Sequence, residues 1–489
     1  MRQKSKSKIK QDKVKIPGRR GTQATINLAN IIDNADQNLF SSVLPQIQSS
    51  LGTSVIGLGT LSGVRAILQS VSTPLWGWWS DRHSRKRVLA AGCFIWALFT
   101  ILISVTFSYI DIFVYRALTG IGLAVIVPTA QSLIADYFSP KTRGRAFGWF
   151  GLTGVLGSVI GVLFATALVS FVSWRVVFLG WGMVSIVVGI LVLIFLKDPV
   201  RGEMEPELRD IITEKKAERY KIQGRDLIKI FKKRTFVLIF LQGTAGSIPW
   251  SGLIFFMVTW FEYIKFPNFI AGIMFALIAV GAAIGNLFGG WLGDKVAKWN
   301  KMRGRIMIAQ ISVFIGIPMT AIIFFVIPMT TSSLFLYCIL GSLTGFAISW
   351  PAGGCNNPIF SEIFTPEVRS SAFSIDRLFE GSFGALGYIF VSVVAAIFGF
   401  ITPPSGTVVS DLPVNSPLRI TNMHALANGM FLMSIIPWII CLILYTFVYF
   451  TYPKDHEDAR KLLESRVFFF EFQKQINDYM DLNIKLGLL

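Results

Sequence analysis

Long apolar runs follow one another along this chain of 489 residues, and they leave few folds open to it. A run of about 18 or more apolar residues can cross a bilayer as a helix. In hydrocarbon each backbone amide must be hydrogen-bonded within the protein, which a helix achieves alone. Only 15% of the residues are charged, against roughly 25% in a typical soluble domain. We therefore expect an all-α membrane protein whose spans, about twelve in number, lie at 24–47, 54–80, 88–108, 110–135, 146–170, 174–196, 235–264, 268–292, 305–328, 332–358, 369–400 and 423–451.

The formal charge of +18 is unevenly placed along the chain. Lys and Arg crowd the first 20 residues and the connections at 82–87, 141–145 and 295–305, whereas the alternate connections hold few. Cytoplasmic loops carry such an excess. The pattern predicts an even number of spans with both termini in the cytoplasm, most simply in the cell membrane. It explains the positive charge without nucleic acid as a partner.

The two halves of the chain repeat each other. SPKTRGRAF at 139–147 matches TPEVRSSAF at 365–373, and Gly77-x-x-x-Asp81 recurs as Gly290-x-x-x-Asp294. Because six spans separate the copies, the halves share one orientation, which implies a pseudo-twofold axis along the membrane normal. The expected divisions are a basic tail (1–23), a six-helix half (24–197), a cytoplasmic linker (198–234), a second half (235–452) and a tail (453–489).

Both cytoplasmic segments contain basic stretches with apolar residues at helical spacing, RDLIKIFKKR at 225–234 and ARKLLESRVFFF at 459–470. Such a helix can lie on the anionic inner leaflet of the bilayer. A helix surrounded by water in the cytoplasm is the alternative, and the sequence leaves both open.

Several motifs resemble the major facilitator superfamily. These are GWWSDRHSRKR at 77–87, Arg116 with Gly120 and Gly122, and the Trp-Arg-x-x-Phe sequence at 174–178. Asp36 followed by VLPQI at 43–47 is similar to the first span of spinster-like organic-solute carriers within that family. The resemblance implies a secondary transporter. We also expect a monomer without a cofactor, and not an enzyme, because the sequence shows no nucleophile–base arrangement.

Charged side chains in the first two spans are the strongest functional signal. A charge at the centre of a membrane helix costs roughly 2.5–3.5 kcal/mol on insertion scales, so it usually faces a cavity or a partner. Asp36 and Arg65 are equally far along the chain from the turn near residue 50, which places them at one depth, with Asp33 one helical turn away. We expect Asp33, Asp36 and Arg65 to couple transport to an ion, most simply a proton. A static pair that pins two helices is the alternative.

The resemblance also implies gating residues. In this family the loop motif latches the cytoplasmic ends of the halves, and the eleventh span is its partner. Carried onto this sequence, the gating set is Gly77, Asp81, Arg82, Arg85, Lys86, Arg116, Asp294, Asp376, Arg377 and Glu380. The alternative for the loop cations is that they only set topology, and for Asp376, Arg377 and Glu380 it is contact with the substrate.

Spans 1, 4, 7 and 10 line the cavity in this family, and here they carry amide and aromatic side chains. The expected substrate-binding residues are Asn34, Gln37, Gln131, Gln242, Ser247, Trp250, Trp350, Asn356 and Asn357. Pro249 and Pro351 stand beside two of the tryptophans and permit a broken helix, which is tolerated where a cavity is lined. A packing kink is the alternative.

These features predict a secondary active transporter that moves a small or medium organic solute, with amphipathic solutes included, by alternating access with proton coupling. The alternatives are a sensor on a transporter scaffold, a uniporter and a lysolipid-type carrier. A bound metal is not expected, because the sequence has no suitable His, Cys and carboxylate cluster.

Overall fold

The computed structural model of the chain describes residues 18–138, 140–199, 230–364 and 366–485. The basic tail before residue 18 and most of the linker lie outside these ranges. Within them the backbone alone is described for 81, 135, 140–145, 353, 361, 366–371, 374 and 462–485.

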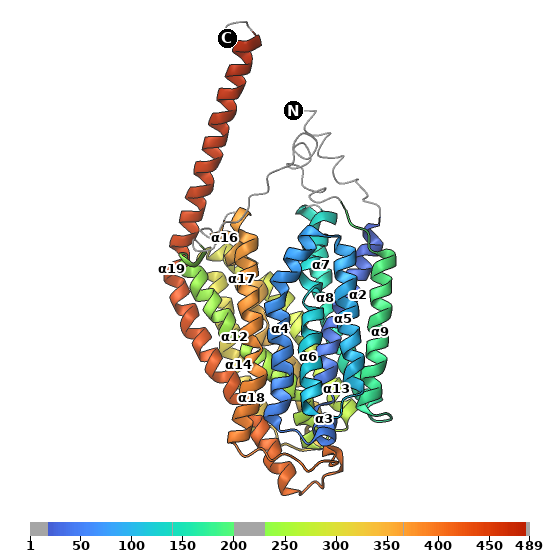
Figure 1. The fold of residues 1–489 in the computed structure, drawn as a ribbon. Helices are drawn as coiled ribbons and strands as arrows, with labels where there is room; N and C mark the ends of the chain where they lie inside the picture. The colour runs from blue at the N-terminus through green and yellow to red at the C-terminus, as the bar shows by residue number, and fades with distance from the viewer. Residues whose placement is uncertain (1–17, 139, 200–229, 365, 486–489) are drawn as a thin grey trace.

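The first half is a bundle of helices that run up and down (Figure 1). Its first and fourth expected spans are each divided in two, at residues 42–43 and 124–125. The helices are α2 (Arg19–Ser41), α3 (Leu44–Leu51), α4 (Val55–Arg82), α5 (Arg85–Ser104), α6 (Tyr109–Leu123), α7 (Ile126–Tyr137), α8 (Pro140–Leu168) and α9 (Trp174–Phe195).

The second half repeats this plan with different interruptions. Its elements are α12 (Arg234–Ile264), α13 (Asn268–Trp299), α14 (Gly304–Ala321) with a π-helical end η1 (Ile322–Val326), η2 (Thr331–Ser333), α15 (Leu334–Ile348), the π-helical η3 (Ala352–Asn356), α16 (Asn357–Ile363), α17 (Pro366–Gly384), α18 (Leu386–Ile397), η4 (Val409–Asp411) and α19 (Pro417–Lys485).

The two prolines beside tryptophans have different effects on their helices. α12 continues through Pro249 without interruption. At Pro351 the α-helix has already ended, and the π-helical turn η3 follows before α16 begins. A broken helix is therefore found only at the second of the two expected places.

Eleven stretches of the described helices are long and apolar enough to cross a membrane. α2 is not one of them, because Asp33, Asp36 and six amide side chains make it too polar. It nevertheless packs inside the bundle, and 13 of its 23 residues are buried. With α2 as the remaining span, the described residues form the expected two halves, and they contain no strand.

α19 crosses the expected boundary at residue 452 as one continuous helix, through Pro437 and Pro453. Its last part extends beyond the bundle at the end where α2 begins (Figure 1). We call this end the tail end, and the opposite end, where α3 lies, the α3 end.

The halves meet through α4 against α17 and α18, and through α8 against α13. Two hydrogen bonds join them in the described part of the chain. Gln37 Nε2 donates to the hydroxyl of Tyr388 over 2.5 Å, and Gly406 N donates to Ser49 O over 2.9 Å. Both lie towards the α3 end, where the rings of Phe40 and Phe255 also stack across the interface, with centroids 6.4 Å apart.

Glycines of α8 hold α2 in place. A Cβ built on Gly157 would lie 2.2 Å from Ile31 O, and one on Gly161 would lie 2.3 Å from Ala35 O. Small residues four apart let two membrane helices approach this closely. The close approach fixes the depth and rotation of the helix that carries Asp33 and Asp36.

We predict that Gly157→Ala lowers the thermal stability of the purified protein, because the new methyl group must push α2 and α8 apart. Overpacking of this kind costs about 1–3 kcal/mol. Gly151→Ala is the matched control on the same helix, because a Cβ added at Gly151 would meet nothing within 4 Å, and it should melt like the wild type. Equal melting temperatures for the two variants would show that the α2–α8 contact does not depend on glycine.

Candidate functional site

Asp36 is the centre of a buried charge cluster that we define as Asp33, Asp36, Arg65 and Arg116. Its Oδ2 lies 3.4 Å from Arg65 Nε and 3.2 Å from Arg116 NH1. Its Oδ1 accepts a hydrogen bond from the indole of Trp96 over 3.3 Å. The side chain is 0% exposed, so the hydrogen bonds from Trp96 and Arg116 and the nearby charge of Arg65 replace the water that an ionised carboxylate requires.

Asp33 is the second carboxylate of the cluster. Its Oδ1 accepts from Arg65 NH2 and from Gln69 Nε2, each over 3.3 Å. Arg65 therefore bridges the two aspartates, as expected from their equal depth, while Arg116 contacts only Asp36 and stacks on Phe40 at 4.0 Å.

The cluster is electrically balanced, with two carboxylates and two guanidinium groups. Each member is less than 10% exposed. Ion pairs taken out of water are stable only when every charge keeps its partner. Four helices contribute to the arrangement, with Asp33 and Asp36 on α2, Arg65 on α4, Arg116 on α6 and Trp96 on α5, so the cluster also ties the first half together.

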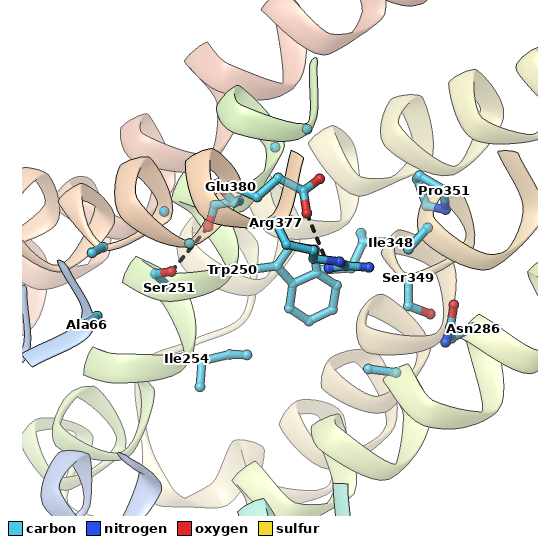
Figure 2. A pocket seen from close by; sticks show the side chains of 18 of the residues that line it. Ala66, Trp250, Ser251, Ile254, Asn286, Ile348, Ser349, Pro351, Arg377 and Glu380 are labelled. Carbon is cyan, nitrogen blue, oxygen red and sulfur yellow. Dashed lines mark hydrogen bonds and ion pairs between the residues drawn. The ribbon is translucent and has the colours of Figure 1, made fainter. Parts of the chain in front are cut away.

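A cavity of about 660 Å³ lies beside the cluster, between the two halves. Arg65 belongs to both, because it lines the cavity as well as pairing with the aspartates. Residues near the middle of α4, α12 and α13 and in the last two turns of α17 form most of the wall, which places the cavity midway along the bundle. Figure 2 shows the wall provided by the second half, with Trp250, Asn286, Arg377 and Glu380 around one space.

Five of the expected substrate-binding residues line this cavity, namely Gln37, Gln242, Ser247, Trp250 and Asn356. The other four do not. Asn34 bonds to Asn30 on its own helix, Gln131 is exposed on α7, and Trp350 is buried between Phe288 and Phe346. Asn357 begins α16 outside the lining residues.

The second half contributes an uncharged network to the cavity wall. Asn356 Nδ2 donates to Gln242 Oε1 over 2.9 Å, and Tyr445 Oη donates to Asn356 Oδ1 over 2.8 Å. Cys441 contacts Gln242 as well. The amides are thereby held in one orientation, ready to present a fixed pattern of donors and acceptors to a solute.

α17 carries three charged residues, of which Arg377 and Glu380 line the cavity. Arg377 NH1 lies 3.2 Å from Glu380 Oε2, and the Arg377 side chain is 60% exposed, so its guanidinium is open to a solute (Figure 2). Glu380 packs against α12, where a Cβ on Gly243 would lie 2.3 Å from its Oε1. Asp376 is buried and does not line the cavity.

The remaining gating residues lie at the tail end, apart from Arg116, which belongs to the charge cluster. Arg85 lies 2.6 Å from Asp136, and Arg305 lies 2.9 Å from Asp294 and 3.7 Å from Glu362. Arg85 with Asp136 and Arg305 with Glu362 thus connect the third and fourth spans of their halves in the same way. Arg82 stacks on Trp78 at 4.0 Å, the backbone of Lys86 contacts Asp198 and Gly77 faces Pro128, while the side chain of Asp81 lies outside the described residues.

Sequence reasoning missed several residues of the site. Tyr388, Asn286 and Trp438 line the cavity from α18, α13 and α19, and Trp96 binds Asp36 from α5. In sequence, the helices that carry these residues look like ordinary apolar membrane spans. An isolated tyrosine or asparagine in an apolar run was the only available signal.

Comparison with known proteins agrees with this geometry. The model of the Major Facilitator Superfamily matches residues 26–388. Protein spinster of Drosophila melanogaster is 27% identical over 236 residues, 47% of this chain and 38% of that protein. The cis,cis-muconate transport protein of Acinetobacter baylyi is 24% identical over 390 residues, 76% of this chain and 90% of that protein. The chain therefore spans well under half of spinster but nearly all of the second relative.

Among solved structures, a bacterial homologue of the human lysosomal transporter spinster, described as inward-facing and unoccupied, superposes with a TM-score of 0.74. It is 21% identical, and the match covers 90% of this chain and 98% of that chain. This likeness establishes a common fold.

We predict that Asp36→Asn destabilises the protein far more than Asp33→Asn. Without Asp36, the buried guanidinium of Arg116 loses the carboxylate with which it pairs, and breaking a buried pair in this way costs about 3–5 kcal/mol. Without Asp33, Arg65 still keeps Asp36. Thermal unfolding of the two single variants in detergent measures the difference.

The double variant Asp36→Asn/Arg116→Gln is the control for charge balance. It removes one charge of each sign, so it should recover part of the stability that Asp36→Asn loses. If the stability loss of the double variant equals the sum of the losses in Asp36→Asn and Arg116→Gln, then Arg116 and Asp36 do not interact energetically.

Proposed function

Because this chain belongs to the major facilitator superfamily, we propose that it is a proton-coupled secondary transporter that moves a small or medium organic solute by alternating access. The relatives found are named transporters, and the fold is a transporter fold rather than that of an enzyme family. The solute and the coupling ion are the parts we infer here. Both inferences rest on Arg65, which lines the cavity and also pairs with Asp33 and Asp36.

Arg65 carries the proposal because it connects the cavity with the carboxylates. A solute that contacts its guanidinium competes with Asp33 and Asp36 for the same donors. Conversely, a proton on Asp33 removes one attraction and frees Arg65 to turn towards the cavity. Asp33 is the better acceptor of the two, because Asp36 retains Arg116 and Trp96 when Arg65 leaves.

Contacts between the halves support alternating access. The two hydrogen bonds that join the halves, from Gln37 and Gly406, close the α3 end. Taken with the excess of Lys and Arg at the tail end, this conformation faces the cytoplasm, and the cell membrane is the simplest location. Opening of the α3 end requires both bonds to break.

The wall of the cavity indicates the kind of solute. Amides of Gln37, Gln242 and Asn356 provide paired donors and acceptors, and Trp250 and Trp438 provide flat apolar surfaces. Arg377 offers an exposed positive charge. An organic solute with polar groups and an apolar face fits these surfaces, and an acidic group on it would pair with Arg377.

A lysolipid is the second candidate, and a small side chamber bears on it. This chamber of about 40 Å³ shares Trp250, Ile254 and Ile348 with the main cavity. Its two threonine hydroxyls bond to backbone carbonyls, so it presents an apolar surface. A chamber with room for about three waters holds a short apolar group rather than a long acyl chain, which favours the smaller solute in this conformation.

We predict that Trp250→Ala weakens solute binding about tenfold, the equivalent of about 1.4 kcal/mol of lost stacking. Bound solute raises the melting temperature of the purified protein. A screen should use cis,cis-muconate, other organic acids and a lysophospholipid as probes. Trp291→Ala, which removes an exposed indole from α13 away from the cavity, is the control. A stabilising solute that responds to Trp291→Ala but not to Trp250→Ala would exclude this cavity as the binding site.

Proton coupling adds an expectation about Asp33. In the wild type the affinity for the stabilising solute should differ between about pH 6 and about pH 8, since protonation of Asp33 alters the partners of Arg65. In Asp33→Asn that difference should disappear. An unchanged pH dependence in the variant would assign coupling to another group.

A further inference from the structure

Asp376 of α17 is a buried carboxyl group that lies outside both the charge cluster and the cavity wall. Its side chain is 4% exposed. Its Oδ1 is enclosed by protein and has no hydrogen-bond partner among the described residues. A buried polar atom without a partner is rare and calls for a specific explanation.

Among the described side chains, none forms an ion pair with Asp376. Arg377, on the next position of the same helix, pairs with Glu380 over 3.2 Å. Glu380 is one helical turn from Asp376, on the same face, at the distance where two like charges repel each other. The guanidinium of Arg377 is therefore the counter-charge available to two carboxyl groups, and it forms its ion pair with Glu380 rather than with Asp376.

The neighbouring helices α12 and α4 pack against α17. The contacts described between them involve Phe240, Gly243, Ser247, Ser251 and Ser70, none of which has a titratable side chain. Glu362 of α16 is already paired with Arg305. Tyr445 of α19 donates its hydroxyl to Asn356.

An ionised carboxylate in this position would lose its water and gain no partner. Such a group is stabilised when a proton neutralises it. A metal ion is a poorer explanation, because the described residues contain no group of three His, Cys, Asp or Glu side chains that could hold one.

We propose that Asp376 and Glu380 form a second proton-binding site, in the second half of the transporter, with the proton on Asp376 while Arg377 holds Glu380. The site is separate from Asp33 and Asp36, and it rests on the proposed function for its role in coupling. Arg377 connects it to the cavity. An acidic group that binds Arg377 releases Glu380, and the two carboxyl groups then retain a proton more strongly because they repel each other when both are ionised.

The consequence for transport is a link between solute and proton. Loading an acidic solute onto Arg377 would favour a protonated Asp376–Glu380 pair, and release of the solute would return Arg377 to Glu380. The first half and the second half would each contribute one proton-binding site to the cycle.

The first test compares thermal unfolding of Asp376→Asn and Asp36→Asn in the full-length protein at neutral pH. Asparagine has the shape and neutrality of a protonated aspartic acid. We expect Asp376→Asn to melt within about 2 °C of the wild type, whereas Asp36→Asn melts well below it. A loss in Asp376→Asn as large as that in Asp36→Asn overturns the proposal, since it would show an ionised, partnered carboxylate.

The second test uses dicyclohexylcarbodiimide, an apolar reagent that adds to protonated carboxyl groups in apolar surroundings. The acid proton passes to the carbodiimide, the carboxylate oxygen bonds to its central carbon, and rearrangement gives a stable N-acylurea. Mass spectrometry should find the adduct on the peptide that contains Asp376 at about pH 6.5 and much less of it at about pH 9. Exposed Asp294, paired with Arg305, is the control and should stay unmodified.

Absence of the adduct on Asp376 at both pH values overturns the proposal. Neither experiment depends on a known solute or on measured transport. The second proton site and the proposed transport function can therefore fail independently of each other.

Discussion

The pairing of Asp36 with Arg65 and Arg116 is the interaction on which the rest of this structure depends. An aspartate that is 0% exposed inside a membrane bundle is tolerable only while a guanidinium group stays beside it, and here Arg65 and Arg116 both do. That requirement fixes the positions of α2, α4 and α6 relative to one another. It also explains why α2 must be held by the close contact of Gly157 and Gly161, since this polar helix gains little from lipid.

The two halves share an architecture but divide the chemistry between them. The first half holds a balanced set of four charges, shielded from the cavity except at Arg65. The second half presents an amide network through Gln242 and Asn356, and a half-open ion pair between Arg377 and Glu380. Arg65 from the first half and Arg377 from the second half both line the cavity between them. Each arginine is also the partner of buried carboxyl groups, which gives binding a physical route to proton transfer.

Much of this arrangement follows from the sequence, and the exceptions have physical reasons. The family, the all-helical fold and its two halves were predictable from apolar runs, motifs and a repeat, and the family match confirms them. The Asp36–Arg65 contact was predictable from equal depth on either side of a short turn. The contact between Asp36 and Arg116 was not predictable, because the two residues lie 80 positions apart in the chain. No local sequence signal shows how α6 is rotated about its axis relative to α2. Pro249 lies within a continuous helix while the helix ends before Pro351, a difference that depends on neighbouring helices rather than on proline itself.

Proton movement coupled to solute movement is the central claim, and reconstituted vesicles with a trapped pH-sensitive dye measure it directly. A solute that stabilises the purified protein is added outside vesicles that have no initial pH difference. We predict that solute entry changes the internal pH, that the change vanishes when a protonophore is present, and that a solute gradient alone can create a pH gradient. Saturable solute entry without any change in internal pH would contradict proton coupling, and the carboxyl groups would then serve only to hold the helices together.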